Sequence, residues 1–171
     1  LKRHKVKVRV QGMMAYTEIT EVFHNPTNDR LEGLYRFPLP EDAQISRLAL
    51  KVGDRIMEGQ FLETARAERI WRDVTIERRR DPALLKWKQG NQFELRIFPI
   101  EPHSARQVTI GYVQRLQPSG QGYTYTYPMP IDRNGQTHTK KFELDAHIAG
   151  HDTAHPVTLL GYKGAQTARV E

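Results

Sequence analysis

The stretch Lys5-Val6-Lys7-Val8-Arg9-Val10 decides the fold class of this chain, because valine and a basic residue alternate in it without exception. Successive side chains of a β-strand point to opposite faces, so one face of this segment is apolar and the other is charged. A segment of that kind buries its apolar face on a core and keeps its charged face in water. The stretch therefore predicts a half-buried β-strand.

The same alternation recurs along the chain at near-regular spacing. Gly53-Asp54 separates two alternating segments and predicts a hairpin, with Gly53 at the positive-φ position of a type II′ turn. Residues 93–97 and 108–112 predict a second hairpin that turns at residues 101–104. The expected strands are residues 5–10, 16–23, 34–37, 45–52, 55–61, 93–97, 108–112, 123–127 and 142–148, with 157–160 as a further candidate. Together they predict a mainly β fold, an antiparallel β-sandwich of about nine short strands.

One segment changes from the strand period to the helix period. Apolar residues between Ala67 and Val74 recur at three- and four-residue intervals, which places them on one face of a helix. This pattern predicts one amphipathic α-helix over about residues 64–79, packed on the sheet and ended before Pro82. Its apolar face anchors it through Ile70, Trp71 and Val74. The arginines of the opposite face and of the run that follows form a candidate interaction surface, namely Arg66, Arg69, Arg72, Arg78, Arg79 and Arg80.

The composition bounds the class of protein. The chain has 171 residues, enough for a single domain over residues 1–171. It has no cysteine, which excludes disulfide frameworks, thiolate nucleophiles and cysteine-bound zinc. No apolar run approaches the roughly 18 residues of a membrane span, and no signal peptide is visible. Because the first residue is not methionine, we expect a processed chain or a fragment of a longer protein.

The net charge of +6 is concentrated in basic clusters within residues 1–9 and 78–88. Such clusters can attract a polyanion or an acidic protein face, although a solvated surface is the simpler interpretation. Tyr123, Tyr125 and Tyr127 could stack nucleic-acid bases. More simply, they fill one face of a strand and keep their hydroxyls at its wet edge. We therefore do not expect nucleic acid as a partner, and we keep polyanion binding open.

The candidate chemical groups do not assemble into a recognisable site. His147, His151 and His155 would align on a helix and could bind zinc, but the strand-like alternation before them and Gly150 keep them apart. No serine lies in a Gly-x-Ser-x-Gly elbow, and no glycine-rich phosphate loop is present. We therefore expect no catalytic residue, no metal site and no cofactor. A pair of carboxylates brought together by the fold stays open as an alternative.

An ordered set of short motifs carries a family resemblance. Residues 35–43 read Tyr-Arg-Phe-Pro-Leu-Pro-Glu-Asp-Ala, and residues 52–56 read Val-Gly-Asp-Arg-Ile, ahead of the predicted helix. The chain continues with Ala83-Leu84-Leu85, Ile100-Glu101-Pro102 and Val108-Thr109-Ile110-Gly111-Tyr112. Over about residues 5–130, this order resembles the VIT domain, the vault protein inter-alpha-trypsin domain. Two positions depart from the family pattern: Met57 replaces an aliphatic residue, and His103 replaces the glycine of a turn.

The resemblance implies a non-catalytic module for protein–protein interaction or scaffolding, and not an enzyme. Such modules usually lie directly before a von Willebrand type A domain, which implies a longer protein, as in bacterial examples, with that domain as a partner. Residues 131–171 would then be additional strands that lead towards the following domain. By family analogy we expect a secreted, periplasmic or cell-surface location, and we expect Gly53, Pro38 and Pro40 to be structural anchors. The alternatives are a polyanion- or glycan-binding β-sandwich that uses the basic clusters and, third, a hydrolase with an unrecognised site.

Overall fold

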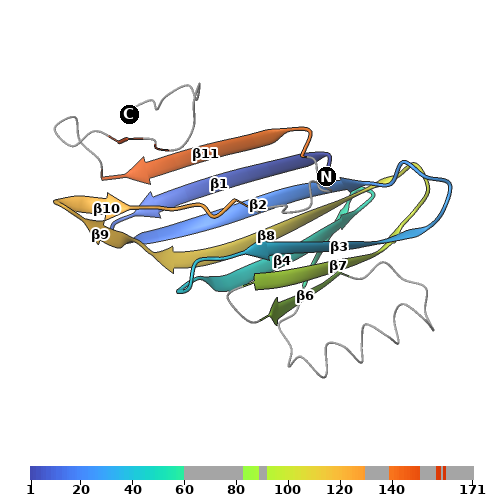
Figure 1. Ribbon diagram of the computed structural model, residues 1–171, viewed down its shortest axis with the longest axis horizontal. Helices are drawn as coiled ribbons and strands as arrows, with labels where there is room; N and C mark the ends of the chain where they lie inside the picture. Colours follow the sequence, from blue (N-terminus) through green and yellow to red (C-terminus); the bar gives the residue numbers. More distant parts are fainter. Residues whose placement is uncertain (60–82, 89–91, 130–138, 151–156, 159, 161–171) are drawn as a thin grey trace.

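The structure is a computed structural model that describes residues 1–59, 83–88, 92–129, 139–150, 157–158 and 160. The described residues are mainly β, as the alternation predicts. They form a six-stranded sheet in the order β11-β1-β2-β8-β4-β5, a three-stranded sheet in the order β3-β7-β6 and a two-stranded sheet of β10 and β9 (Figure 1). The strands are β1 (Arg3–Gln11), β2 (Met14–His24), β3 (Leu31–Pro38), β4 (Gln44–Val52), β5 (Arg55–Glu58), β6 (Ala83–Lys88), β7 (Gln92–Ile100), β8 (Ala105–Arg115), β9 (Gln117–Ser119), β10 (Gly122–Thr124) and β11 (Phe142–Ala149).

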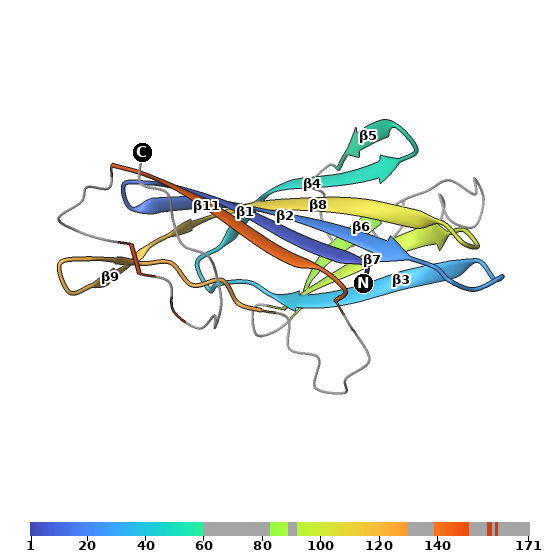
Figure 2. The same ribbon diagram turned by 90° about the horizontal axis from the view of Figure 1, so that it is seen from above.

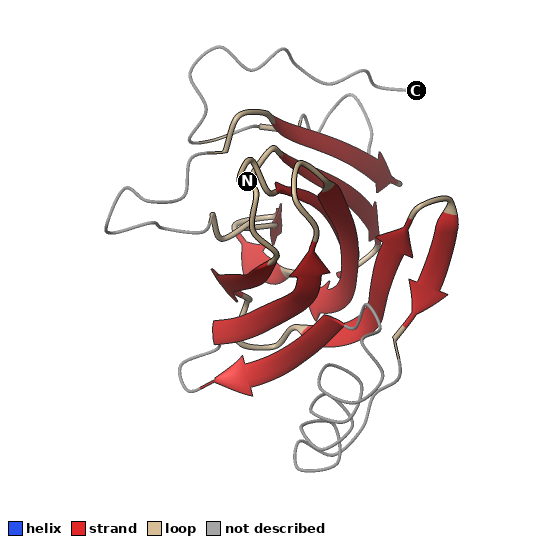
Figure 3. Ribbon diagram, turned by 90° about the vertical axis from the view of Figure 1, so that its right-hand side faces the viewer, coloured by secondary structure: helices blue, strands red, loops and turns tan. Residues whose placement is uncertain are grey.

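The six-stranded and three-stranded sheets share one apolar core. They lie as curved layers that face each other (Figures 2 and 3). Ile110 of β8 and Leu95 of β7 are both completely buried in the core between the layers. The buried residues of this first core are Ile19, Tyr35, Phe37, Leu39, Leu50, Leu95, Ile97, Ile100, Val108, Ile110 and Tyr112. Burial of this much apolar surface is the main force that holds the two sheets together.

A second apolar cluster lies under β1, on the same face of the six-stranded sheet. Its buried residues are Val6, Val8, Val10, Ala15 and Leu116. The valines that define the opening stretch of sequence are thus buried, while Lys7 and Arg9 between them are exposed. The prediction of a half-buried strand is confirmed, and its apolar face packs on this second cluster.

The predicted hairpin around Gly53-Asp54 is confirmed. β4 and β5 pair antiparallel from Val52↔Arg55 to Ala49↔Glu58, and Gly53 has φ 58°. A side chain in that left-handed region is strained, so glycine suits the first turn position. The two prolines of the family motif flank Leu39, which is buried: Pro38 ends β3, and the Pro40 carbonyl accepts a hydrogen bond from the Ala43 amide.

Two expectations about strand pairing are wrong. The six-stranded sheet is mixed and not purely antiparallel, because β11 runs parallel to β1. Residues 93–97 and 108–112 do not form a hairpin either. β7 pairs with β3 and β6, whereas β8 pairs with β2 and β4, so the chain changes sheet at residues 101–104. Both outcomes depend on contacts between distant parts of the chain, which alternation within a strand does not specify.

Three further predictions concern the segments at residues 83–85, 157–160 and 64–79. Leu84 and Leu85 belong to a strand, β6, that the alternation did not predict. Of the candidate strand at 157–160, the described residues Val157, Thr158 and Leu160 are not in a strand. The predicted helix at about residues 64–79 lies outside the described residues, as do its anchors Ile70, Trp71 and Val74.

The turn residue His103 adopts a left-handed backbone conformation, with φ 53°. This is the position where the family pattern has glycine, and a residue with a Cβ atom is strained there by about 1–2 kcal/mol. The His103 ring offsets part of that cost, because its Nε2 donates a hydrogen bond of 2.7 Å to Asn28 Oδ1.

The stability of variants at position 103 should therefore depend on how well the new residue tolerates the left-handed backbone conformation. We expect His103→Val to be less stable than His103→Gly by about 1–2 kcal/mol, because valine is β-branched and tolerates this region poorly. Urea unfolding of the two variants measures the difference directly. A valine variant as stable as the glycine variant would contradict the strained turn.

Candidate interaction surface

The arginines predicted to form an interaction surface lie outside the described residues. These are Arg66, Arg69, Arg72, Arg78, Arg79 and Arg80. In the part of the chain that the structure describes, polar side chains gather on the side of the six-stranded sheet that points away from the three-stranded sheet. We call it the outer face, and it carries Lys5, Lys7, Arg9, Tyr16, Glu18, Thr20, Arg47, Glu58, Thr109, Gly111, Glu143 and Asp145.

The basic row of β1 lies beside an acidic row on β11. Glu143 and Asp145 are the register partners of Lys5 and Lys7. The Glu143 carboxylate accepts a hydrogen bond from the Arg3 guanidinium at 2.7 Å and lies 4.0 Å from Lys5 Nζ. The sequence predicts an unopposed basic cluster within residues 1–9, but the fold brings carboxylates next to it. A mixed face of this kind suits a protein surface better than a polyanion.

The cations around Glu143 lower the pKa of its carboxyl group to about 2, through hydrogen bonds from Lys141 and from Arg3. A carboxyl group with a lowered pKa in the folded state stabilises that state above its ordinary pKa, here 4.5, and the contribution is lost as pH falls towards about 2. We expect the amide protection of β11 to decrease over this range more than that of β2. The variant Glu143→Gln should lack this part of the pH dependence, and hydrogen exchange followed by NMR measures both. Equal pH dependence in the variant and the wild type would contradict the assignment.

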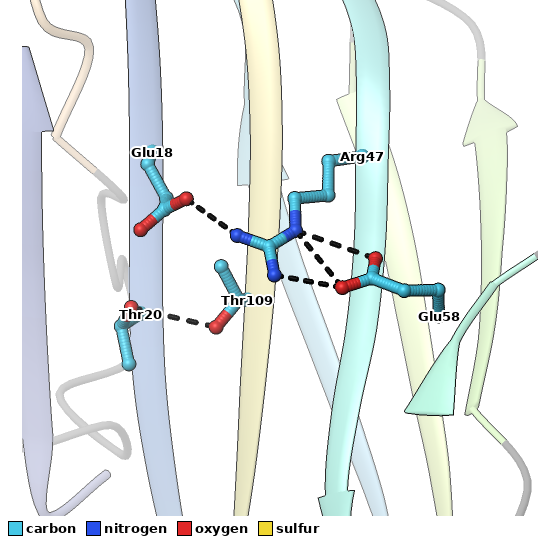
Figure 4. Close-up of polar contacts among 5 residues, drawn as sticks. All are labelled: Glu18, Thr20, Arg47, Glu58 and Thr109. Carbon is cyan, nitrogen blue, oxygen red and sulfur yellow. Dashed lines mark hydrogen bonds and ion pairs between the residues drawn. The ribbon is translucent and has the colours of Figure 1, made fainter. Parts of the chain in front are cut away.

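Arg47 links three strands across the outer face (Figure 4). Its Nη2 donates to Glu58 Oε1 of β5 at 2.7 Å, and its Nη1 donates to Glu18 Oε2 of β2 at 2.7 Å. The hydrogen bond to Glu58 is the main reason why the pKa of the Arg47 guanidinium is raised, and the same bond lowers the pKa of the Glu58 carboxyl. The guanidinium therefore stays charged and is held in a fixed orientation on the surface.

Gly111 of β8 makes room for this network. A Cβ atom at that position would lie 2.5 Å from Tyr16 Oη and 2.9 Å from Arg47 Cβ. We expect Gly111→Ala to lower the free energy of unfolding by about 1–3 kcal/mol, because both neighbours have to move. Gly122→Ala is the matched control: the nearest atom to its added Cβ is Ser119 O at 4.0 Å. Urea unfolding should separate the two variants, and equal stability would contradict the close approach.

A buried polar cluster lies on the opposite, inner face of the same sheet. His4 Nδ1 and Glu21 Oε1 are 2.7 Å apart, and His4 Nε2 lies 2.7 Å from Tyr127 Oη. Burial raises the pKa of the Glu21 carboxyl, and the hydrogen bond from His4 acts in the opposite direction. Burial, followed by the charge of the same carboxylate, raises the pKa of the Tyr35 hydroxyl.

His4 and Glu21 are residue types that occur in acid–base sites, but a substrate has no access to them. The His4 and Glu21 side chains are 3% and 1% exposed. A substrate cannot reach them without opening the core, so the pair acts as a structural clamp. The sequence carries one signal for it: Glu21 is in phase with the buried Thr17 and Ile19, which places a carboxylate on the apolar face of β2.

The tyrosine stripe differs from its prediction. Only Gly122–Thr124 is a strand there, and Tyr123 is exposed. Tyr125 and Tyr127 leave that strand and cover the second apolar cluster. Their hydroxyls are not at a wet edge, because Tyr125 Oη lies 2.8 Å from Thr17 Oγ1 and Tyr127 Oη contacts His4.

The histidines considered for zinc do not form a described site. His147 is exposed on β11, and His151 and His155 lie outside the described residues. Within the described ranges, no group of three His, Cys, Asp or Glu side chains could hold a metal ion. In the same ranges, no helix is long and apolar enough to cross a membrane.

Residues 1–112 match the family described as VIT, vault protein inter-alpha-trypsin domain. The comparison with curated proteins found no match. The matched residues include β1 to β7 and end within β8, so β9, β10 and β11 lie beyond the match.

Proposed function

Because the chain belongs to the VIT domain family, whose members are typically found with von Willebrand type A domains, we propose that it is a non-catalytic interaction and scaffolding module. In this proposal it acts directly next to a type A domain of the same protein. The family is generally non-catalytic, which is consistent with this role. The confirmed family resemblance covers most of the chain.

The outer face is the observation that carries the proposal. Arg47 is held by two carboxylates yet remains partly exposed, with 34% of its side chain accessible. Fixed arginines and tyrosines are the residue types that contribute most to protein interfaces, because little conformational freedom is lost when they bind. Tyr16 lies beside Arg47, and the rows of β1 and β11 place charges of both signs on the side of β2 away from β8. Such a pattern selects a partner by charge complementarity.

Binding to the type A domain tests the proposal. The two domains are prepared separately, and their affinity is measured by titration calorimetry. We expect the double variant Lys7→Glu/Arg9→Glu to bind at least about tenfold more weakly, which is about 1.4 kcal/mol. Arg55→Glu is the control, since Arg55 is exposed at the β4–β5 turn on the other face of the sheet.

Two results would contradict the proposal. Absence of binding between the wild-type domains at high concentration would remove the interaction itself. Equal affinities for the double variant and the control would remove the outer face as the site. If the full-length protein contained no type A domain, the proposed arrangement would also be wrong.

A further inference from the structure

The first strand of the family-matched region has an unusual neighbour. On one side β1 pairs antiparallel with β2, and on the other side it pairs parallel with β11, from His4↔Phe142 to Gln11↔Ala149. Residues 142–149 lie beyond the matched residues 1–112. Within the matched region β1 is therefore an edge strand, with backbone N–H and C=O groups that need a partner.

β11 fits this edge through two sets of side chains. Its Phe142, Leu144 and Ile148 point inwards and pack on the second apolar cluster. The Phe142 ring stacks on His4, with ring centroids 5.5 Å apart. On the outer side, Glu143 and Asp145 lie opposite Lys5 and Lys7.

β11 is also the less buried partner in this pair. None of its residues is buried, whereas His4, Val6, Val8 and Val10 of β1 are. Among the described strands it pairs with β1 alone, and the small Ala146 lies opposite Val8. Strands with few buried contacts open at a lower free-energy cost than the core of the same domain.

We propose that the edge of β1 and the second apolar cluster form a strand-docking site, and that β11 is its displaceable occupant. The site accepts an extended segment parallel to β1 in which inward apolar residues alternate with outward acidic residues. A partner segment of this chemistry takes the place of β11 by adding a strand to the sheet. Backbone pairing supplies the affinity, while the apolar cluster and the lysines supply the selectivity. This site goes beyond the proposed function, because its backbone edge and its apolar cluster do not belong to the outer face, with which it shares Lys5 and Lys7.

The test uses full chains whose own β11 is prevented from docking. In Leu144→Asp/Ile148→Asp, two carboxylates would have to be buried on the apolar cluster, so β11 leaves the site. In Ala146→Pro, the strand is interrupted without an added charge. The probe is a fluorescent peptide with the sequence of residues 140–150, and its binding is followed by fluorescence anisotropy. We expect saturable binding to both variants, at least about tenfold tighter than to the wild type, whose site is occupied.

The matched control exchanges the charges of the peptide's Asp145 and the chain's Lys7. A peptide with Asp145→Lys should bind the docking-deficient chain more weakly, because its lysine meets Lys7. Adding Lys7→Glu to that chain should restore the binding of this peptide and weaken the binding of the original one. Such a reversal would not arise from nonspecific adhesion to exposed apolar residues.

The proposal is overturned if neither variant binds the peptide while the NMR signals of Ile19, Ile110 and Leu95 show that the first core is intact. It is also overturned if the original peptide and the Asp145→Lys peptide bind equally well to the docking-deficient chain, with and without Lys7→Glu, since the register would then be absent. Neither result depends on binding to a type A domain, so this inference and the proposed function fail separately.

Discussion

Replacing Glu21 by alanine is expected to lower the free energy of unfolding by about 3–5 kcal/mol, because it leaves His4 buried without its partner. Both side chains are almost completely inaccessible to water, and their atoms are 2.7 Å apart. His4 also contacts Tyr127, so the loss of its position loosens the segment that covers the second apolar cluster. Urea unfolding at neutral pH measures the effect, and a loss below about 1 kcal/mol would contradict the buried clamp.

Glu21→Gln is the matched variant, since its amide oxygen can still accept a hydrogen bond from His4 Nδ1. We expect a smaller loss than with alanine. The pKa of Glu21 is raised above its ordinary 4.5 by burial, so the protonated form favours the folded state. That contribution is fully present below pH 4.5 and is lost as pH rises through the folded-state pKa. The wild type should therefore lose stability relative to Glu21→Gln as pH rises above 4.5, and the opposite trend would contradict the burial argument.

Ile110→Ala is expected to lower the free energy of unfolding by about 2–5 kcal/mol, because it opens a cavity in the core that both sheets share. Ile110 is completely buried on β8, between Ile19 and Leu48 in the register of the six-stranded sheet. Ile56→Ala removes the same atoms from a side chain that is 60% exposed on β5. It should change stability by no more than about 0.5 kcal/mol. Chemical unfolding compares the two, and similar losses would contradict the tight packing of Ile110 in the first core.

Much of the strand content could be predicted from the sequence, because each half-buried strand carries its own alternation. Val6, Val8 and Val10 identify β1, and Gly53 identifies the β4–β5 hairpin through its positive φ. The family match over residues 1–112 confirms the resemblance that the ordered motifs indicate. These signals are local, so they do not depend on what the strand packs against.

The pairing of strands could not be predicted in the same way. The turn around His103 can close a hairpin or carry the chain to the other sheet. The alternation of apolar and polar residues in the flanking strands is the same in both cases, so it does not distinguish them. The parallel contact of β1 with β11 joins residues about 140 positions apart, as in the Arg3–Glu143 ion pair. The polar sites follow from these contacts: Arg47 reaches Glu18 only because glycine lies between them on β8.

We propose that the outer face of the six-stranded sheet binds a neighbouring type A domain, and an NMR titration would locate that contact residue by residue. Isotope-labelled chain is titrated with the unlabelled type A domain while the backbone amide signals are followed. We expect shifts concentrated at Lys7, Arg9, Tyr16, Glu18 and Arg47. Signals of the three-stranded sheet should stay in place. Shifts confined to β3 and β7, or no shifts at saturating partner, would contradict it.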